Sequence, residues 1–320
     1  MCNWISTIIE RSTRRLFVTG PDDLFHTALC PSATRRADRL VSALPPLIYE
    51  DRAEVNCEVH MLCGSKAALM GIWASYSLLK HLNHMPLLVH SDGTLGMVDK
   101  DAWRRVIPWA QFIERSDAED RFVETVGKQS SIASSWRDTN HTGLKLFDPH
   151  LFGSLNNILM IDSDVLFFEY PLELINSIDG RFHWNHDVQN AYTVPLENMR
   201  TLIGSAVPEK LNSGVMLMPR LDTSALRSMA AVLELFYEHG WRDLTHFWYE
   251  QTIYAGLIGS LGHRTGCRLS QPYDCVIRAS QECQVARHYC GNGVSRPRFF
   301  TEGVPRVANS LDLVKRTERN

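Results

Sequence analysis

The feature that most constrains the fold is an alternation of short apolar segments with longer segments of helical spacing. The alternation begins at Glu58, where the irregular composition of the first part of the chain ends. The segments that follow it are strands at 59–62, 86–90, 111–114 and 157–161, and helices at 66–82, 99–107 and 145–155. Alternation of this kind predicts an α/β fold, in which a mainly parallel central sheet is flanked by helices.

Two carboxylates follow the last of these strands. Asp162 and Asp164 come directly after the apolar run 158–161 and before a second apolar run, 165–168. Alternate residues of extended backbone point the same way, and burying an ionised carboxylate costs several kcal/mol unless it is paired or bound to a cation. Hard divalent cations such as Mg²⁺ and Mn²⁺ bind carboxylate oxygens and often share their remaining positions with substrate phosphates. The sequence therefore predicts a metal-diphosphate site at the carboxyl end of a strand, where open α/β sheets place their ligand crevice.

The rest of the chain is predicted to complete a single catalytic domain over 51–310. Three later segments fit the same layered fold, a buried strand at 211–218 and helices at 224–238 and 250–258. No Gly/Ser/Pro-rich linker divides the chain after residue 50. Residues 1–50 are predicted to be an irregular N-terminal extension, and 311–320 a C-terminal tail. The arginine pairs of the extension either lie in solvent or contact a partner.

Composition excludes several classes of function. The chain has 320 residues, of which 22% are charged, and a formal net charge of -3, so it lacks the basic excess typical of nucleic-acid binding. No apolar stretch approaches the roughly 20 residues that span a bilayer, and the first residues lack the apolar core of a signal peptide. The predicted location is therefore cytoplasmic, where the eight cysteines would be reduced thiols. Four cysteines recur at seven- or eight-residue spacing without a C-x2-C pair, which disfavours a structural zinc; they are Cys267, Cys275, Cys283 and Cys290.

Several motifs occur in one order along residues 58–300. They are Leu62-Cys63-Gly64, Ser91-Asp92-Gly93, Lys145-Leu146, Asp162-Ser163-Asp164, Asn212-Ser213-Gly214, Glu250-Gln251 and His288-Tyr289-Cys290-Gly291. In this order the chain resembles the nucleotide-sugar glycosyltransferases of the GT-A fold. It is most similar to the retaining family 8, which includes glycogenin and bacterial galactosyltransferases.

The resemblance implies a role for each matched residue. The metal ion, Mn²⁺ or Mg²⁺, would be held by Asp162, Asp164 and His288. The nucleotide-sugar donor would be bound by Leu62, Cys63, Gly64, Asp92, Lys145, Ser163, Asn212, Ser213, Gly291 and Arg296. The catalytic residues beside the transferred sugar would be Glu250 and Gln251, either as a transient nucleophile or as a support for a front-face ion pair. Asp187, in the segment 183–187, is a further candidate that would hold a sugar hydroxyl.

Some of these residues have a second interpretation. Asp162 could contact the ribose instead of the metal, and His288 alone would be an ordinary strand histidine. Lys145 could be a solvated helix residue, and Asp187 a loop charge. The Asn212-Ser213-Gly214 segment could be a turn, because all three residue types favour turns.

Two positions depart from the family pattern. The segment after His288 is two residues longer than usual and carries Arg296 where a lysine is typical. Glu250 stands where aspartate is typical, so its carboxylate extends one methylene further.

The implied reaction transfers a sugar from a nucleoside diphosphate sugar, most simply a uridine-linked one, to an acceptor hydroxyl with retention of configuration. The acceptor would be a glycan, a lipid or a small molecule. Two alternatives remain open on the residues alone. A non-catalytic nucleotide-sugar-binding protein could use the same fold, and an aspartate-nucleophile phosphatase also has a D-x-D sequence after a strand.

Overall fold

The computed structural model describes residues 20–51, 56–262, 266–277, 284–290 and 294–313. Its centre is a seven-stranded sheet in the order β3-β2-β1-β4-β7-β6-β8, and β5 and β9 form a separate pair. The strands are β1 (Cys57–Cys63), β2 (Leu87–Ser91), β3 (Gln111–Ile113), β4 (Asn157–Ile161), β5 (Val165–Phe167), β6 (Phe182–His186), β7 (Leu211–Pro219), β8 (Gly266–Arg268) and β9 (Ala286–His288). The predicted α/β architecture with a mainly parallel sheet is confirmed.

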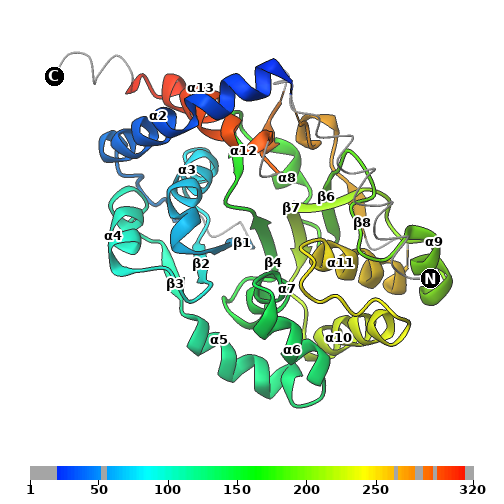
Figure 1. Cartoon of the computed structure of the whole chain (residues 1–320). Coiled ribbons are helices and arrows are strands. Elements are labelled where there is room, and N and C mark those ends of the chain that lie inside the picture. The colour runs from blue at the N-terminus through cyan, green and yellow to red at the C-terminus, as the bar shows by residue number, and fades with distance from the viewer. Residues whose placement is uncertain (1–19, 52–55, 263–265, 278–283, 291–293, 314–320) are drawn as a thin grey trace.

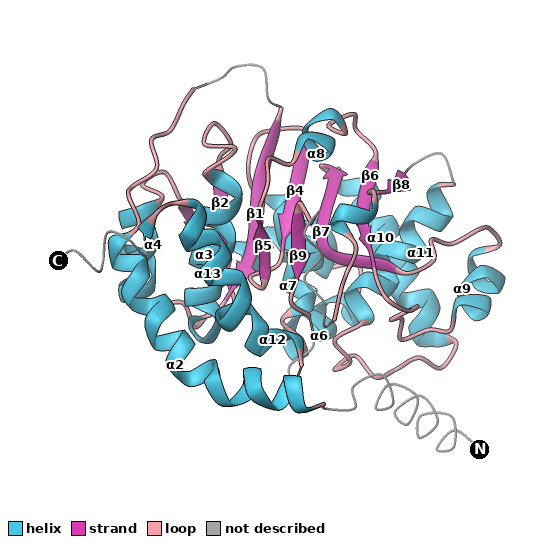
Figure 2. Ribbon diagram, turned by 90° about the horizontal axis from the view of Figure 1, so that it is seen from above, coloured by secondary structure: helices cyan, strands magenta, loops and turns pink. Residues whose placement is uncertain are grey.

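Helices cover both faces of the sheet (Figures 1 and 2). Their bounds are α2 (Pro21–Ala43), α3 (Ala68–Leu79), α4 (Met97–Val106), α5 (Arg115–Phe122), α6 (Ser131–Thr139), α7 (Thr142–Leu151), α8 (Leu172–Asn176), α9 (Leu196–Ile203), α10 (Thr223–Glu238), α11 (Tyr249–Leu261), α12 (Ser295–Arg298) and α13 (Val304–Ser310). One core lies under α2, α3, α4 and α13, and a second lies under α6, α7, α10 and α11. Strand β4 serves both, since Leu159 and Ile161 face the first core while Ile158 and Met160 face the second.

The direction of the strands gathers the polar ends at one edge. Strand β1 is parallel to β2 and β4, whereas β7 is antiparallel to β4 and β6 is antiparallel to β7. The carboxyl ends of β1, β2, β4 and β6 and the amino end of β7 therefore lie at the same edge. This edge carries the predicted site residues that follow or begin these strands, which are Gly64, Asp92, Asp162, Asp187 and Asn212.

Two expectations about local structure are wrong. The helix expected at 145–155 spans Thr142–Leu151 and ends earlier because Phe152 is extended and Gly153 adopts a positive φ of 88°. The N-terminal extension expected to be irregular contains α2, a 23-residue helix.

Helix α2 forms because its first turn is capped and one face is apolar. The Gly20 backbone N–H donates to the Asp23 carboxylate at 3.0 Å, and Pro21 occupies the first helical position. Leu40 and Val41 are buried against α3 in the first core. The sequence does not predict this helix, because it contains Pro31 and the exposed Arg35-Arg36 pair interrupts the apolar pattern. The other arginine pair, Arg14-Arg15, lies outside the described residues. No helix among the described residues has both the length and the apolarity needed to cross a bilayer.

Candidate active site

The ends of β1 and β2 are joined at the site edge. The Asp92 backbone N–H donates to the carbonyl of Cys63 at 3.1 Å, and the Asp92 carboxylate accepts from the Thr94 hydroxyl at 2.6 Å. A Cβ atom on Gly64 would lie 2.0 Å from the Asp92 carboxylate, so this position requires glycine. Cys63 is buried and Leu62 is half-buried. These residues form the hydrogen-bonded end of the sheet on the β1 side of the acidic pair.

Two carboxylates and one imidazole meet where β4 ends. The Nε2 atom of His288 lies 3.1 Å from a carboxylate oxygen of Asp164 and 3.6 Å from one of Asp162. The small β5–β9 pair brings them together, because Val165 is the ladder partner of His288. One ligand atom from each of the three predicted metal ligands lies within 4.8 Å of the other two. This donor set fits a hard divalent cation such as Mn²⁺.

The charges of His288 and Asp164 shift each other's pKa values. Burial disfavours the charged form of His288, but the Asp164 carboxylate, the Cys290 sulfur and the Asp162 carboxylate outweigh it and raise the imidazole pKa to about 10. Burial likewise opposes ionisation of Asp164, but His288 and Arg296 outweigh it and lower the carboxyl pKa to about 2. The Arg296 guanidinium lies 3.2 Å from Asp164. Cation binding therefore requires His288 to give up its Nε2 proton.

A hydrogen-bonded chain behind His288 fixes its ring. The Nδ1 atom lies 2.8 Å from the side-chain oxygen of Asn212, and the Asn212 amide nitrogen donates to Asp187 at 2.8 Å. The Asn212 oxygen also accepts from the Gly214 backbone N–H at 2.9 Å. A Cβ atom on Gly214 would lie 2.2 Å from His288 Nδ1, so the ring needs glycine there. Asn212 and Asp187 thus position the imidazole, and burial raises the pKa of Asp187.

Lys145 is buried and holds two carboxylates. Its Nζ atom lies 2.7 Å from Asp162 and 3.1 Å from Glu250, and it donates to the Ser213 carbonyl at 3.0 Å. Burial opposes its charge, but the two carboxylates outweigh burial and raise its pKa. Burial raises the carboxyl pKa of Glu250 to about 7, against the attraction of Lys145. The Ser213 hydroxyl also contacts Glu250 at 3.2 Å.

The remaining predicted residues lie apart from this contact network or outside the described residues. Gln251 is buried and donates to the Ala191 carbonyl. Ser163 is half-buried between the two aspartates. Gly291 lies outside the described residues. Sequence reasoning missed the close approach of Cys275 to His288, at 3.8 Å, because 13 residues separate them and no motif spacing marks the pair.

Comparison with known proteins gives a fold. No family model matches the chain, and no curated protein matches it in sequence. The galactosyltransferase LgtC, solved with donor and acceptor sugar analogs, is 15% identical with a TM-score of 0.52, and the match covers 79% of this chain and 95% of that one. The bifunctional glycosyltransferase WbbM is 12% identical with a TM-score of 0.53, and the match covers 84% of this chain and 53% of that one. The chain therefore has the GT-A fold of nucleotide-sugar glycosyltransferases that its sequence predicted.

Proposed function

We propose that this protein is a metal-dependent glycosyltransferase that moves a sugar from a uridine diphosphate sugar to an acceptor hydroxyl with retention of configuration. The observation that carries the proposal is the convergence of Asp162, Asp164 and His288 at the edge of a sheet with the GT-A fold. Each carboxylate also has a cationic partner from a distant element, Lys145 for Asp162 and Arg296 for Asp164. The sheet edge with several strand ends is also the usual place for a nucleotide in open α/β folds.

Mn²⁺ or Mg²⁺ would be held by the Asp162 and Asp164 carboxylates and by Nε2 of His288. When bound, a dication about 3 Å from a departing diphosphate charge supplies a gross attraction of about 11 kcal/mol at an effective dielectric of about 20. Arg296 lies beside Asp164 with its side chain 42% exposed, so it can also reach a phosphate. Leu62, Cys63, Gly64 and Asp92 form the nearby strand ends available for the base and ribose.

The contacts of Lys145 support a role other than the donor contact that the resemblance implies. All three of its ammonium hydrogens have acceptors within reach, in Asp162, Glu250 and Ser213. The ammonium therefore keeps two carboxylates at fixed positions instead of binding the diphosphate. We propose Lys145 as a positioning residue that orients Asp162 toward the metal and Glu250 toward the sugar.

The sugar would lie between the metal site and the start of α11. Glu250 is held by Lys145 and Ser213 and can steady the positive charge that develops at the anomeric carbon. Asp187 and Gln251 are the further predicted sugar contacts. A retaining transfer lets the leaving diphosphate accept the acceptor proton, so no separate base is needed on the opposite face.

Calorimetric titration with uridine diphosphate tests the proposal, with the protein in Mn²⁺ and in excess chelator. We expect binding that requires Mn²⁺ and is lost in Asp164→Asn. The matched control is Asp120→Asn, since Asp120 is exposed on α5. Equal nucleotide affinity with and without metal would overturn the metal assignment. Metal-dependent binding with no sugar transfer across a screen of uridine diphosphate sugars and acceptors would instead support the non-catalytic alternative.

A further inference from the structure

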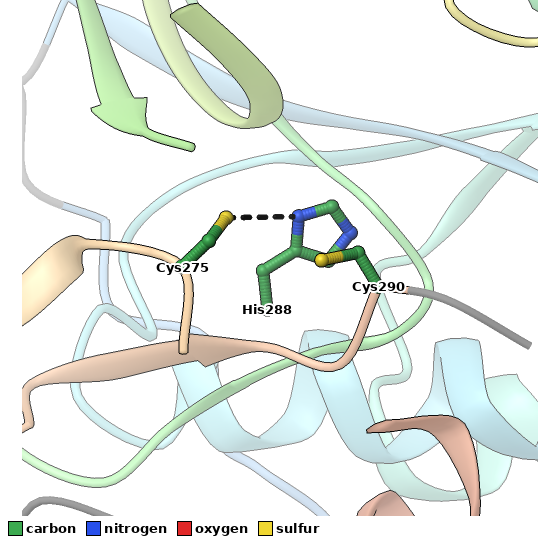
Figure 3. A group of neighbouring side chains, drawn as sticks. All are labelled: Cys275, His288 and Cys290. Atoms are coloured by element: carbon green, nitrogen blue, oxygen red, sulfur yellow. Dashed lines mark hydrogen bonds between the residues drawn. The ribbon is translucent and has the colours of Figure 1, made fainter. Parts of the chain in front are cut away.

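A second group of metal-binding side chains lies behind His288. One sulfur atom each from Cys275 and Cys290 and a ring nitrogen of His288 all lie within 4.8 Å of one another. Figure 3 shows both sulfur atoms beside the imidazole ring. Cys275 comes from the loop after the short helical turn Gln271–Tyr273, whereas His288 ends β9 and Cys290 follows two residues later. Tertiary structure alone brings the two thiols together.

The surroundings of Cys275 suit a metal-bound sulfur. Its backbone N–H donates to the carbonyl of His186 at 2.8 Å, which fixes the loop against the end of β6. The side-chain amide of Asn185 donates to the Cys275 sulfur at 3.2 Å. Asn185 is itself held, because its oxygen accepts from the Val215 backbone N–H at 3.1 Å. A fixed N–H donor to sulfur is the outer-shell contact that orients and stabilises a thiolate ligand.

The two nitrogens of His288 face different donor sets. Nε2 faces the Asp162 and Asp164 carboxylates, while Nδ1 lies 3.8 Å from the Cys275 sulfur. Oxygen donors favour hard cations and thiolates favour Zn²⁺ and other softer ions. The same imidazole therefore separates a hard site from a soft one.

We propose that Cys275, Cys290 and Nδ1 of His288 form a binding site for a thiophilic divalent cation of the Zn²⁺ type. Three protein ligands leave the fourth tetrahedral position to a water molecule. Binding releases the protons of both thiols and of Nδ1. Because Nδ1 also hydrogen-bonds to Asn212 at 2.8 Å, occupancy of this site breaks that bond and changes the support of the carboxylate site. The proposal stands on the thiol geometry and does not depend on sugar transfer.

Cobalt is a spectroscopic probe for such a site, because thiolate ligands give Co²⁺ an intense near-ultraviolet charge-transfer band that grows with the number of thiolates. We expect the reduced, metal-free full-length protein to develop a two-thiolate band that saturates as one Co²⁺ per chain fills this site, and Zn²⁺ to abolish the band. The band should fall to about half in Cys275→Ser and in Cys290→Ser. It should be unchanged in Cys30→Ser, since Cys30 is half-buried on α2, far along the chain from the cluster.

A thiolate band that survives intact in Cys290→Ser would overturn the proposal, as would the absence of any such band at saturating Co²⁺. Cys290 is half-buried, so its serine variant preserves more packing than that of the buried Cys275. Circular dichroism of the Cys290→Ser protein confirms that a lost band reflects lost ligation in a folded chain. With a folded Cys290→Ser protein, the measurement decides between the two outcomes even if Cys275→Ser does not fold.

Discussion

The Nδ1 atom of His288 lies 2.8 Å from the side-chain oxygen of Asn212, a residue 76 positions earlier in the chain. The orientation of the Asn212 amide is fixed, because its nitrogen donates to the Asp187 carboxylate and its oxygen accepts from the Gly214 N–H. The Asn212 oxygen can only accept, so Nδ1 carries a proton and Nε2 is the nitrogen left for the carboxylate site. The hydrogen bond thus selects the tautomer of His288 that a metal at Asp162 and Asp164 requires.

Removing this bond should weaken metal binding without removing a ligand. We expect Asn212→Ala to lower the Mn²⁺ affinity about 10- to 100-fold, the usual cost of losing an outer-shell partner. Free Mn²⁺ measured by electron paramagnetic resonance gives the affinity directly. Asn156→Ala, at an exposed position just before β4, should leave it unchanged. An unchanged affinity in Asn212→Ala would show that the ring is held by packing alone.

A methyl group at residue 214 should displace the same imidazole ring. The Cβ atom of Gly214→Ala would lie 2.2 Å from His288 Nδ1, so the imidazole must move. Overpacking of this kind costs roughly 1–3 kcal/mol of stability, and we expect Mn²⁺ affinity to fall as well. Gly96→Ala is the matched control, since its Cβ would meet Asp99 at an ordinary 3.7 Å. Equal Mn²⁺ affinity in the two variants would contradict this geometry.

The sheet and its acidic edge could be predicted because local sequence patterns determine both. Apolar runs mark the strands, and the Asp162 and Asp164 pair follows one of them directly. Contacts between distant residues could not be predicted from local patterns. The Asn212–His288 hydrogen bond and the Lys145–Glu250 ion pair each join residues on separate elements, 76 and 105 positions apart.

Helix α2 could not be predicted from local patterns either. Pro31 and the exposed arginines weaken its local helical preference and its apolar periodicity, so its stability comes from tertiary contacts. Arg298, on α12, forms ion pairs with Asp22 and Asp23 at the start of α2. Helix α2 therefore packs onto the predicted 51–310 domain, and a truncation that begins at residue 51 should lose stability.

Lys145 should be essential for stability as well as for the site. Its removal leaves the Asp162 and Glu250 carboxylates without their shared cation, and breaking a buried ion pair on one side costs about 3–5 kcal/mol. We expect urea unfolding to show such a loss in Lys145→Met and little change in Lys128→Met, which is exposed. Adding Glu250→Gln to Lys145→Met should recover part of the loss. If the two changes are additive, the Lys145–Glu250 contact contributes nothing.

Acid should destabilise the protein through three buried histidines, of which two lie on the neighbouring strands β1 and β2 and one on α7. Burial lowers the pKa of His60 and of His150 to about 3, and that of His90 well below its usual value. As pH falls below about 6.5 these three histidines take up protons in the unfolded chain but not in the folded chain. Their contribution to stability therefore falls by up to about 1.4 kcal/mol per pH unit for each histidine. The melting temperature should therefore drop steeply between pH 6.5 and pH 4.

The slope of melting temperature against pH distinguishes proton uptake by a histidine from the packing that its substitution removes. His90→Gln should melt with a shallower dependence on pH, whatever its stability at pH 7. His141→Gln is the control, because His141 is exposed and should leave the slope unchanged. An equally steep acid limb in His90→Gln would mean that other groups control acid unfolding.

Glu250 should affect turnover more than donor binding. Its carboxylate is held by Lys145 and Ser213 beside the metal site, where negative charge stabilises the oxocarbenium-like transition state but not the bound nucleotide. Glu250→Gln keeps the size of the side chain and removes its charge, so we expect kcat to fall about 100-fold or more with little change in uridine diphosphate affinity. Glu124→Gln, on the surface, should change neither kcat nor the nucleotide affinity.

The product should keep the anomeric configuration of the donor. Proton NMR of the first product made by the wild-type enzyme reads this configuration directly. An α-linked donor should give an α-linked product, since a retaining reaction uses the leaving diphosphate as its base. A β-linked product would require a base on the opposite face of the sugar, and would overturn both the role of Glu250 and the retaining mechanism.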